Sequence, residues 1–154
     1  MATDKKVIFA TFLLDEQKYA LAIDVLIRVI HSLYITPLPK SPEIILGIIN
    51  IEGNLIPVAD LRKRFRIRQK NIELKDQFII AQTKTRQISL VVDKVGDIIN
   101  ISQDEIINEK NILPEMPYIK GLIALEDGVI LINDLDAFLN LEEEKMLDQA
   151  LNNV

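Results

Sequence analysis

An internal repeat constrains the fold of this chain more than any single motif. The pattern of apolar and acidic residues in 7–66 returns in residues 76–140, so the chain divides into two related halves. Before a proline-rich loop the matched positions lie 69 residues apart, and after it they lie 74 apart. A spacing that stays constant over most of both halves is hard to obtain by chance. Matched pairs are Phe9 and Phe78, Leu21 and Leu90, Asp24 and Asp93, Gly47 and Gly121, Ile56 and Ile130, and Asp60 and Asp134.

Each half predicts about five short strands followed by a short helix. Short runs of β-branched residues between turn residues favour strands, as in 7–14 and 88–92. Five short strands without a long helix suit a small closed barrel, because closure removes exposed sheet edges. Neither half alone would bury enough surface for comfortable stability. We therefore predict a mainly β fold: two five-stranded β-barrels packed on each other, one from each half, with short helices.

The whole chain, residues 1–154, is expected to form a single domain. The last segment, about 141–152, is predicted to be a helix that covers part of the joint between the barrels, since its apolar residues recur at helical spacing. Asn140 with Glu143 is a suitable cap for its start.

Residues 47–65, GIINIEGNLIPVADLRKRF, are predicted to form a hairpin followed by a short helix. Gly53 and Asn54 both tolerate the positive φ that a tight hairpin turn requires. Asp60 is a suitable cap for the helix, and Arg62 with its basic neighbours is expected on the solvent side. The segment holds no nucleophile, histidine or cysteine, so it is expected to present a surface.

The composition excludes several classes of site. The chain has no cysteine and one histidine, which removes disulfides, thiolate chemistry and His-pair metal sites, so no cofactor or metal is expected. A net charge of −5 and an aromatic content of 5% argue against nucleic acid as a partner. No apolar run reaches the ~20 residues of a membrane span. The N-terminus lacks the features of a signal peptide, so a cytoplasmic protein without direct membrane insertion is expected.

Three features leave functional alternatives beside structural roles. His31 follows an apolar strand and is expected to be structural or exposed, because catalysis would need partner groups that the sequence does not supply. Asp24 and Asp93 hold matched positions, so a paired-carboxylate hydrolase stands beside the favoured role of capping turns. The basic run from Arg62 to Lys70 suits a solvated face or a protein contact better than nucleic acid or an acidic membrane. The rival classes are thus a small β-barrel enzyme and a structural homo-oligomer.

Several motifs together resemble one family over nearly the whole chain. They are Tyr19-Ala20-Leu21-Ala22-Ile23-Asp24, Gly47-x-x-Asn50-x-x-Gly53-x-x-Ile56-Pro57-Val58-x-Asp60-Leu61-Arg62, and Val91-Val92-Asp93-x-Val95. This pattern is similar to CheW, the adaptor that joins chemoreceptors to a sensor histidine kinase in bacterial chemotaxis. The resemblance implies two SH3-like five-stranded β-barrels, no catalysis and no cofactor. It also implies two partners, the regulatory domain of a CheA-type histidine kinase and the cytoplasmic tip of chemoreceptors, through which the protein would associate with membrane receptor arrays.

The same resemblance implies a receptor-binding groove around the first hairpin. A receptor's helical tip would enter it as an amphipathic helix enters an apolar groove, and a second face would meet the kinase domain. Asp60 and Arg62 would supply a helix cap and a basic face beside it. The groove residues that the resemblance implies are Leu26, Arg28, Val29, Gly47, Asn50, Glu52 and Gly53.

Two of these residues depart from the family pattern in charge. The family usually carries arginine where this chain has Glu52, and often an acidic residue where it has Arg28. Because both charges are reversed together, we expect Arg28 and Glu52 to form a swapped ion pair across adjacent strands, worth ~0–1 kcal/mol at a surface. The departure also favours an alternative function, that of a CheW-like paralogue in a pilus or other non-flagellar pathway.

Overall fold

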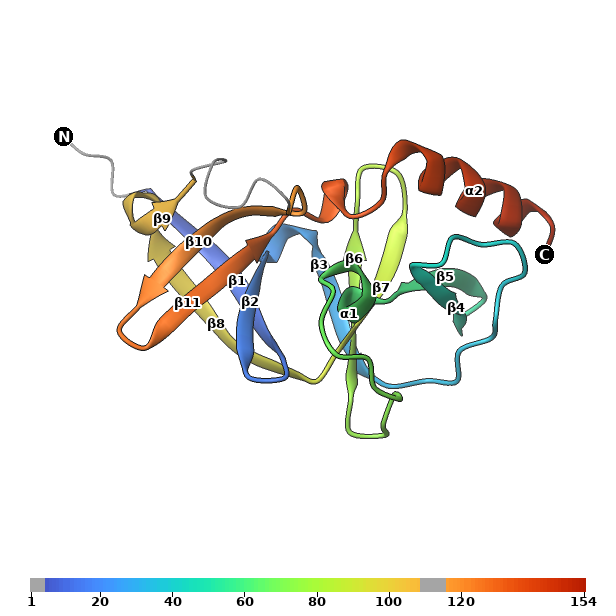
Figure 1. The fold of residues 1–154 in the computed structure, drawn as a ribbon, viewed down its shortest axis with the longest axis horizontal. Helices are drawn as coiled ribbons and strands as arrows, with labels where there is room; N and C mark the ends of the chain where they lie inside the picture. The colour runs from blue at the N-terminus through green and yellow to red at the C-terminus, as the bar shows by residue number, and fades with distance from the viewer. Residues whose placement is uncertain (1–4, 109–115) are drawn as a thin grey trace.

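The computed structural model describes residues 5–108 and 116–154, which form two packed β-sheets (Figure 1). The six-stranded sheet has the order β8 (Lys94–Ser102), β1 (Lys6–Leu14), β2 (Gln17–Ala22), β11 (Gly128–Asn133), β10 (Ile119–Leu125) and β9 (Ile106–Ile107). The five-stranded sheet has the order β3 (Leu26–His31), β6 (Gln77–Gln82), β7 (Gln87–Val92), β5 (Asn54–Ala59) and β4 (Ile45–Ile51). The helices are η1 (Ile23–Val25), α1 (Leu61–Arg64), η2 (Gln103–Glu105), η3 (Leu135–Ala137) and the C-terminal α2 (Leu141–Asn152). The prediction of a mainly β fold with few helices and a C-terminal helix is confirmed.

Each sheet draws strands from both halves of the sequence. β1 and β2 pair with β8 and β11 of the second half, whereas β6 and β7 complete the sheet of β3, β4 and β5. The sheets therefore do not coincide with the halves, contrary to the expectation of one barrel from each half. The physical reason is that a repeat shows which strands are alike but not which strands pair. Two similar strands can each pair with the same neighbour, so a strand of one half can take its place in the sheet of the other.

The two sheets nevertheless have the same strand order and register when matched strands are compared. Val29 pairs with Ile79 between β3 and β6, and the residues at the matched positions, Ile98 and Ala10, pair between β8 and β1. The hairpins β4–β5 and β10–β11 also shift register at matched places. The extent of the repeat, residues 7–66 and 76–140, stays a prediction drawn from the sequence.

Three apolar clusters stabilise the fold. Each sheet curls around an interior of its own, and the largest cluster lies between the sheets and continues under α2. Because burial of apolar surface is the main stabilising term, the joint between the sheets is part of the core. The interior of the five-stranded sheet contains Ile49, Ile51, Ile56, Val58, Phe78 and Ile80, and that of the six-stranded sheet contains Phe9, Ala20, Ile123, Ile130 and Ile132.

Four aromatic rings stack in a column across the joint. Phe12 of β1 stacks on Tyr19 of β2, and Phe65 after α1 stacks on Tyr118 before β10. Tyr19 and Phe65 join the two pairs, and the successive ring centroids lie 5.5, 4.9 and 5.0 Å apart. Such aromatic pairs add ~0.5–1.5 kcal/mol each beyond burial. Burial also raises the pKa of Tyr19 to about 12, because the charged phenolate loses its hydration there.

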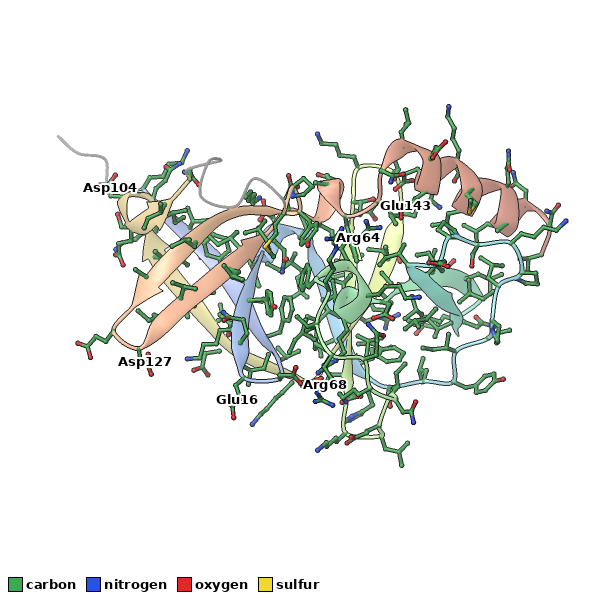
Figure 2. All side chains as sticks on the ribbon, viewed as in Figure 1. Glu16, Arg64, Arg68, Asp104, Asp127 and Glu143 are labelled. Atoms are coloured by element: carbon green, nitrogen blue, oxygen red, sulfur yellow. The ribbon has the colours of Figure 1, made fainter. Side chains whose placement is uncertain are left out.

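Helix α2 begins beside the β6–β7 turn and runs over the five-stranded sheet (Figure 1). Asn140 and Glu143 close its first turn in a reciprocal capping box, and Leu147 and Ala150 are its buried residues. Figure 2 shows Arg64 and Glu143 pointing toward each other where the helix starts. The ion pairs that hold α2 are Arg64 with Glu143, Arg86 with Glu144, and Arg86 with Asp148.

The turn of the first hairpin lies one residue earlier than the sequence predicts. Ile51 pairs with Asn54, so Glu52 and Gly53 form the two-residue loop. Their φ values are +53° and +88°, as a type I′ turn requires at both central positions. The Asn50 side-chain oxygen accepts a hydrogen bond from the Gly53 N–H at 2.9 Å. This bond stabilises the turn with Glu52 in the left-handed conformation.

Candidate protein-binding surface

Strand β3 positions the three predicted groove residues that come first in the chain. Leu26 and Val29 are partly buried against the core between the sheets, and they pair with Ala81 and Ile79 of β6. Arg28 is exposed, and its position next to Val29 turns it to the opposite face of the strand. Apolar groove residues therefore lie at the joint, while the charged one faces away from it.

The tip of the β4–β5 hairpin positions Asn50, Glu52 and Gly53, all of which are exposed. Asn50 uses its side-chain oxygen within the turn. Among the described residues, no hydrogen bond or ion pair links this tip to Leu26, Arg28 or Val29. The structure therefore presents the predicted groove residues as two separate groups, one on β3 and one on the hairpin.

The predicted ion pair between Arg28 and Glu52 is not formed. β3 and β4 are the two outer strands of the five-stranded sheet, so they are not adjacent strands. No described acidic group lies within 4.0 Å of a nitrogen of Arg28. The prediction is wrong because the strand that pairs with β3 is β6, which comes from the other half of the chain.

Gly47 is buried within β4 rather than open to a partner. Its φ is +153°, and a Cβ there would come within 2.2 Å of the Thr36 carbonyl oxygen. Thr36 and Ile48 exchange two backbone hydrogen bonds of 2.9 and 2.8 Å, which fix that approach. Close backbone packing alone therefore requires glycine at this position.

Arg62 lies in the joint rather than on a solvent face, contrary to the sequence prediction. Its side chain is 8% exposed, and Nη2 lies 3.0 Å from Asp15 Oδ1 and 2.7 Å from Asp93 Oδ2. Nη1 donates to the Arg68 carbonyl oxygen at 2.8 Å. The prediction is wrong because α1 is a single turn, and its second residue faces the β1–β2 turn. Asp60 caps this turn, accepting a hydrogen bond from the Lys63 N–H.

The ion network around Arg62 joins the two sheets. Asp15 belongs to the β1–β2 turn of the six-stranded sheet, and its N–H donates to Asp93 at 2.6 Å. The hydrogen bond from Arg62 holds the pKa of Asp15 below its usual value, although partial burial opposes this. Burial tends to lower the pKa of Arg62, but its bonds to Asp15 and Asp93 outweigh that effect and raise it. Asp93 is thus engaged in a structural contact, whereas its repeat counterpart Asp24 is exposed.

Sequence reasoning missed Asp15 as a member of this network. The available signal was the difference between matched positions, because Arg62 corresponds to Asp136 and Asp15 corresponds to Lys84. A pair of positions whose charges both reverse between two repeats is a candidate for direct contact.

Other candidate sites can be placed in the described part of the chain. His31 is exposed at the end of β3. Across residues 5–108 and 116–154, no group of three His, Cys, Asp or Glu side chains is arranged to hold a metal ion. In the same ranges no helix has the length and apolar character needed to cross a membrane.

Comparison with known proteins identifies the family. The model of the CheW-like domain matches residues 9–143, which include both hairpins and the Arg62 network. The chain belongs to the CheW-like domain family. The family resemblance drawn from the sequence motifs is therefore confirmed.

The alignments with relatives in this family span most of this chain and most of each relative. The "Chemotaxis protein CheW" of Rhizobium meliloti is 31% identical over 112 residues, which cover 71% of this chain and 72% of that protein. The "Chemotaxis protein CheW" of Thermotoga maritima is 31% identical over 130 residues, covering 84% and 85%. The crystal structure of scaffolding protein TtCheW from Thermoanaerobacter tengcongensis superposes with a TM-score of 0.84 at 30% identity, covering 93% of this chain and 99% of that one.

Proposed function

We propose that this chain is a non-catalytic adaptor that couples chemoreceptors to a sensor histidine kinase in bacterial chemotaxis-type signalling. The match to the CheW-like domain over residues 9–143 carries the proposal, and the likeness to a scaffolding protein supports it. The adaptor would act by position, because two partners held on one rigid body bias each other's states. Its place of action would be the cytoplasm, at receptor arrays that it reaches through its partners.

The proposed receptor surface uses both groups of groove residues. Leu26 and Val29 offer apolar atoms at the joint, where the apolar face of a helical receptor tip can pack. Asn50 and Glu52 offer polar groups at the hairpin tip, which set partner choice more than affinity. Gly47 contributes by keeping β4 in place rather than by contact, so its substitution is not a clean test of binding.

The second partner of the adaptor would be the regulatory domain of the kinase. The two sheets of this chain share strand order and register, so each sheet presents a related set of outer strands. A regulatory domain of the same family would carry related strands. Barrel-to-barrel contact between the two proteins is therefore a natural mode of docking.

Charge reversal at one exposed residue tests the receptor surface. We expect Glu52→Arg to weaken binding to a cognate receptor tip about tenfold, because a contact selected for a carboxylate would meet a like charge. Glu126→Arg is the matched control, since Glu126 holds the equivalent exposed place in the β10–β11 turn. Binding is measured by co-sedimentation with receptor tips and by pull-down of the kinase regulatory domain.

The two arms of this experiment separate the components of the proposal. Weaker receptor binding by Glu52→Arg alone, with kinase-domain binding unchanged, is the expected result. Equal effects of both substitutions would contradict the receptor surface on the first hairpin. Failure of the unmodified protein to capture either partner would contradict the adaptor role itself and favour an enzyme or a structural homo-oligomer.

The charge of Glu52 favours one specific alternative, an adaptor for a pilus or another non-flagellar pathway. Receptors that meet arginine in other family members would meet glutamate here. Binding assays with receptor tips from the flagellar and non-flagellar systems of the same organism distinguish the two pathways. A preference for the flagellar set would contradict the alternative.

A further inference from the structure

A second concave site lies outside the proposed receptor surface, where α1, η3 and the start of α2 meet. It has a volume of about 420 Å³, which lies within the range of ligand-binding clefts. None of the predicted groove residues lines it. The side chains that give it its character are Lys63, Arg64, Arg66, Tyr118, Phe138 and Glu143.

The site is positively charged within an acidic chain. Lys63 and Arg66 are exposed, and the charged side-chain nitrogens of neither residue lie within 4.0 Å of a described acidic group. Arg64 is already neutralised by Glu143, with its Nη2 2.6 Å from a carboxylate oxygen. Glu43 also lines the site, so the unpaired side chains leave an excess of one positive charge. The chain as a whole carries −5, so this excess is local.

The floor of the site is the ring of Tyr118. This residue is 8% exposed and ends the aromatic column that crosses the joint. Its hydroxyl makes no hydrogen bond to any residue of the described ranges. Burial raises the pKa of Tyr118, and the charges of Arg66 and Arg64 oppose that rise. These two cations therefore act electrostatically on the hydroxyl, which has no hydrogen-bond partner among the described residues.

The other wall of the site is apolar. The Phe138 ring carries the Arg64 guanidinium 5.4 Å from its centroid, which fixes the cation in place. Arg64 also has a buried Nε without a partner in the described part of the chain. A ligand for this site therefore needs an anionic group for the cations and an aliphatic stem for the apolar wall.

We propose that this site accepts an acidic side chain of a partner polypeptide, with the carboxylate between Lys63 and Arg66. The Tyr118 hydroxyl would donate a hydrogen bond to the same carboxylate. Glutamate and aspartate combine the required charge with a short apolar stem, which charge complementarity favours over a bare inorganic anion. The contact lies outside the proposed receptor surface, and it does not depend on which pathway the protein serves.

The test uses the full chain labelled with ¹⁵N, titrated with a blocked hexaglutamate peptide at low salt. A blocked hexaglutamine peptide and inorganic phosphate serve as the comparison ligands. We expect hexaglutamate to shift the amide signals of Tyr118, Ala137 and Asn140, which line the site. We expect Lys63→Gln combined with Arg66→Asn to weaken binding by about tenfold or more, because charge-assisted hydrogen bonds are lost. Asparagine suits position 66, where φ is +57°.

Controls make every outcome decisive. Lys75→Gln combined with Lys94→Gln removes the same charge from exposed positions outside the site and is expected to retain binding. Each variant is first checked for an unchanged melting temperature, and Lys63→Gln alone serves if the double variant is unstable. Equal losses in both double variants, or shifts confined to other residues, would overturn the proposal. Phosphate that competes as strongly as hexaglutamate would also overturn it, by showing a general anion site.

Discussion

Two matched contacts hold the joint, and they differ in chemistry. In the first, the buried Arg62 of α1 reaches the β1–β2 turn through a partly buried ion pair with Asp15. In the second, Asp136 of η3 reaches the β6–β7 turn by accepting a hydrogen bond from the Lys84 N–H at 2.8 Å. The pairs occupy the same places in the repeat, yet the charges are exchanged and the second contact is exposed. The shared fold therefore determines where the two sheets contact each other, while the residues at those places determine how much each contact stabilises the protein.

Removal of Arg62 tests this comparison with the largest expected effect. Arg62→Met leaves Asp15 and Asp93 without their buried partner, so we expect the free energy of unfolding to fall by about 3 kcal/mol. Asp136→Ala removes one exposed hydrogen bond and is expected to cost less than about 1 kcal/mol. Urea unfolding followed by circular dichroism measures both. Similar losses for the two variants would show that the contacts are equivalent.

The glycines of the two hairpins extend the comparison to the backbone. Gly47→Ala places a Cβ 2.2 Å from a backbone oxygen, so we expect a loss of about 2 to 3 kcal/mol. At Gly121 the closest atoms would be 3.0 Å away, and we expect about 1 kcal/mol or less. Thermal melting distinguishes the two. A smaller loss at Gly47 would mean that the 36–37 segment can move aside.

The stability at high pH is expected to depend on one side chain that the first half has and the second half lacks. Tyr19 has a pKa of about 12, whereas its repeat counterpart is Ile88. Since the folded pKa is raised, the stabilising effect is complete below about pH 10 and is lost as pH rises through the folded value. Between about pH 10 and 12, we expect the free energy of unfolding of Tyr19→Phe to fall less than that of the unmodified protein. The difference is expected to be on the order of 2 kcal/mol. Parallel pH profiles of the two would contradict this.

Titration at low pH gives the smallest effect. The folded pKa of Asp15 is lowered, so its contribution is present above the ordinary value and is lost as pH falls below about 4. We expect Asp15→Asn to flatten the acid limb of the stability profile, measured by melting temperature. Lys84→Gln is the matched control in the other turn and is expected to leave that limb unchanged.

Local features of this fold follow from the sequence. The presence of the first hairpin, the Asp60 cap and the start of α2 after Asn140 depend on residues within four positions of each other. Turn and capping chemistry acts over such distances, so short motifs specify it. The turn at Glu52 and Gly53 was missed by one residue, because Gly53 and Asn54 satisfy the same backbone rule.

Long-range features do not follow from the same reasoning. The exchange of strands between halves was not predicted, because β1 and β6 are alike and each fits the other's place. Burial of Arg62 was not predicted either, because its partners come from turns elsewhere in the chain. The prediction of an Arg28–Glu52 ion pair was wrong for a related reason, because it assumed that strands close in sequence are neighbours in the sheet.

The exchanged strands also set the order in which this protein can form. The five-stranded sheet needs β7, which ends at Val92, and the six-stranded sheet needs β11, which ends at Asn133. During synthesis, therefore, β1 and β2 cannot pair with β8 and β11 until most of the second half has left the ribosome. Such non-local pairing slows folding and leaves strand edges open to other chains. Neither half can be cut out as a module, and a break anywhere between β5 and β7 would divide both sheets at once.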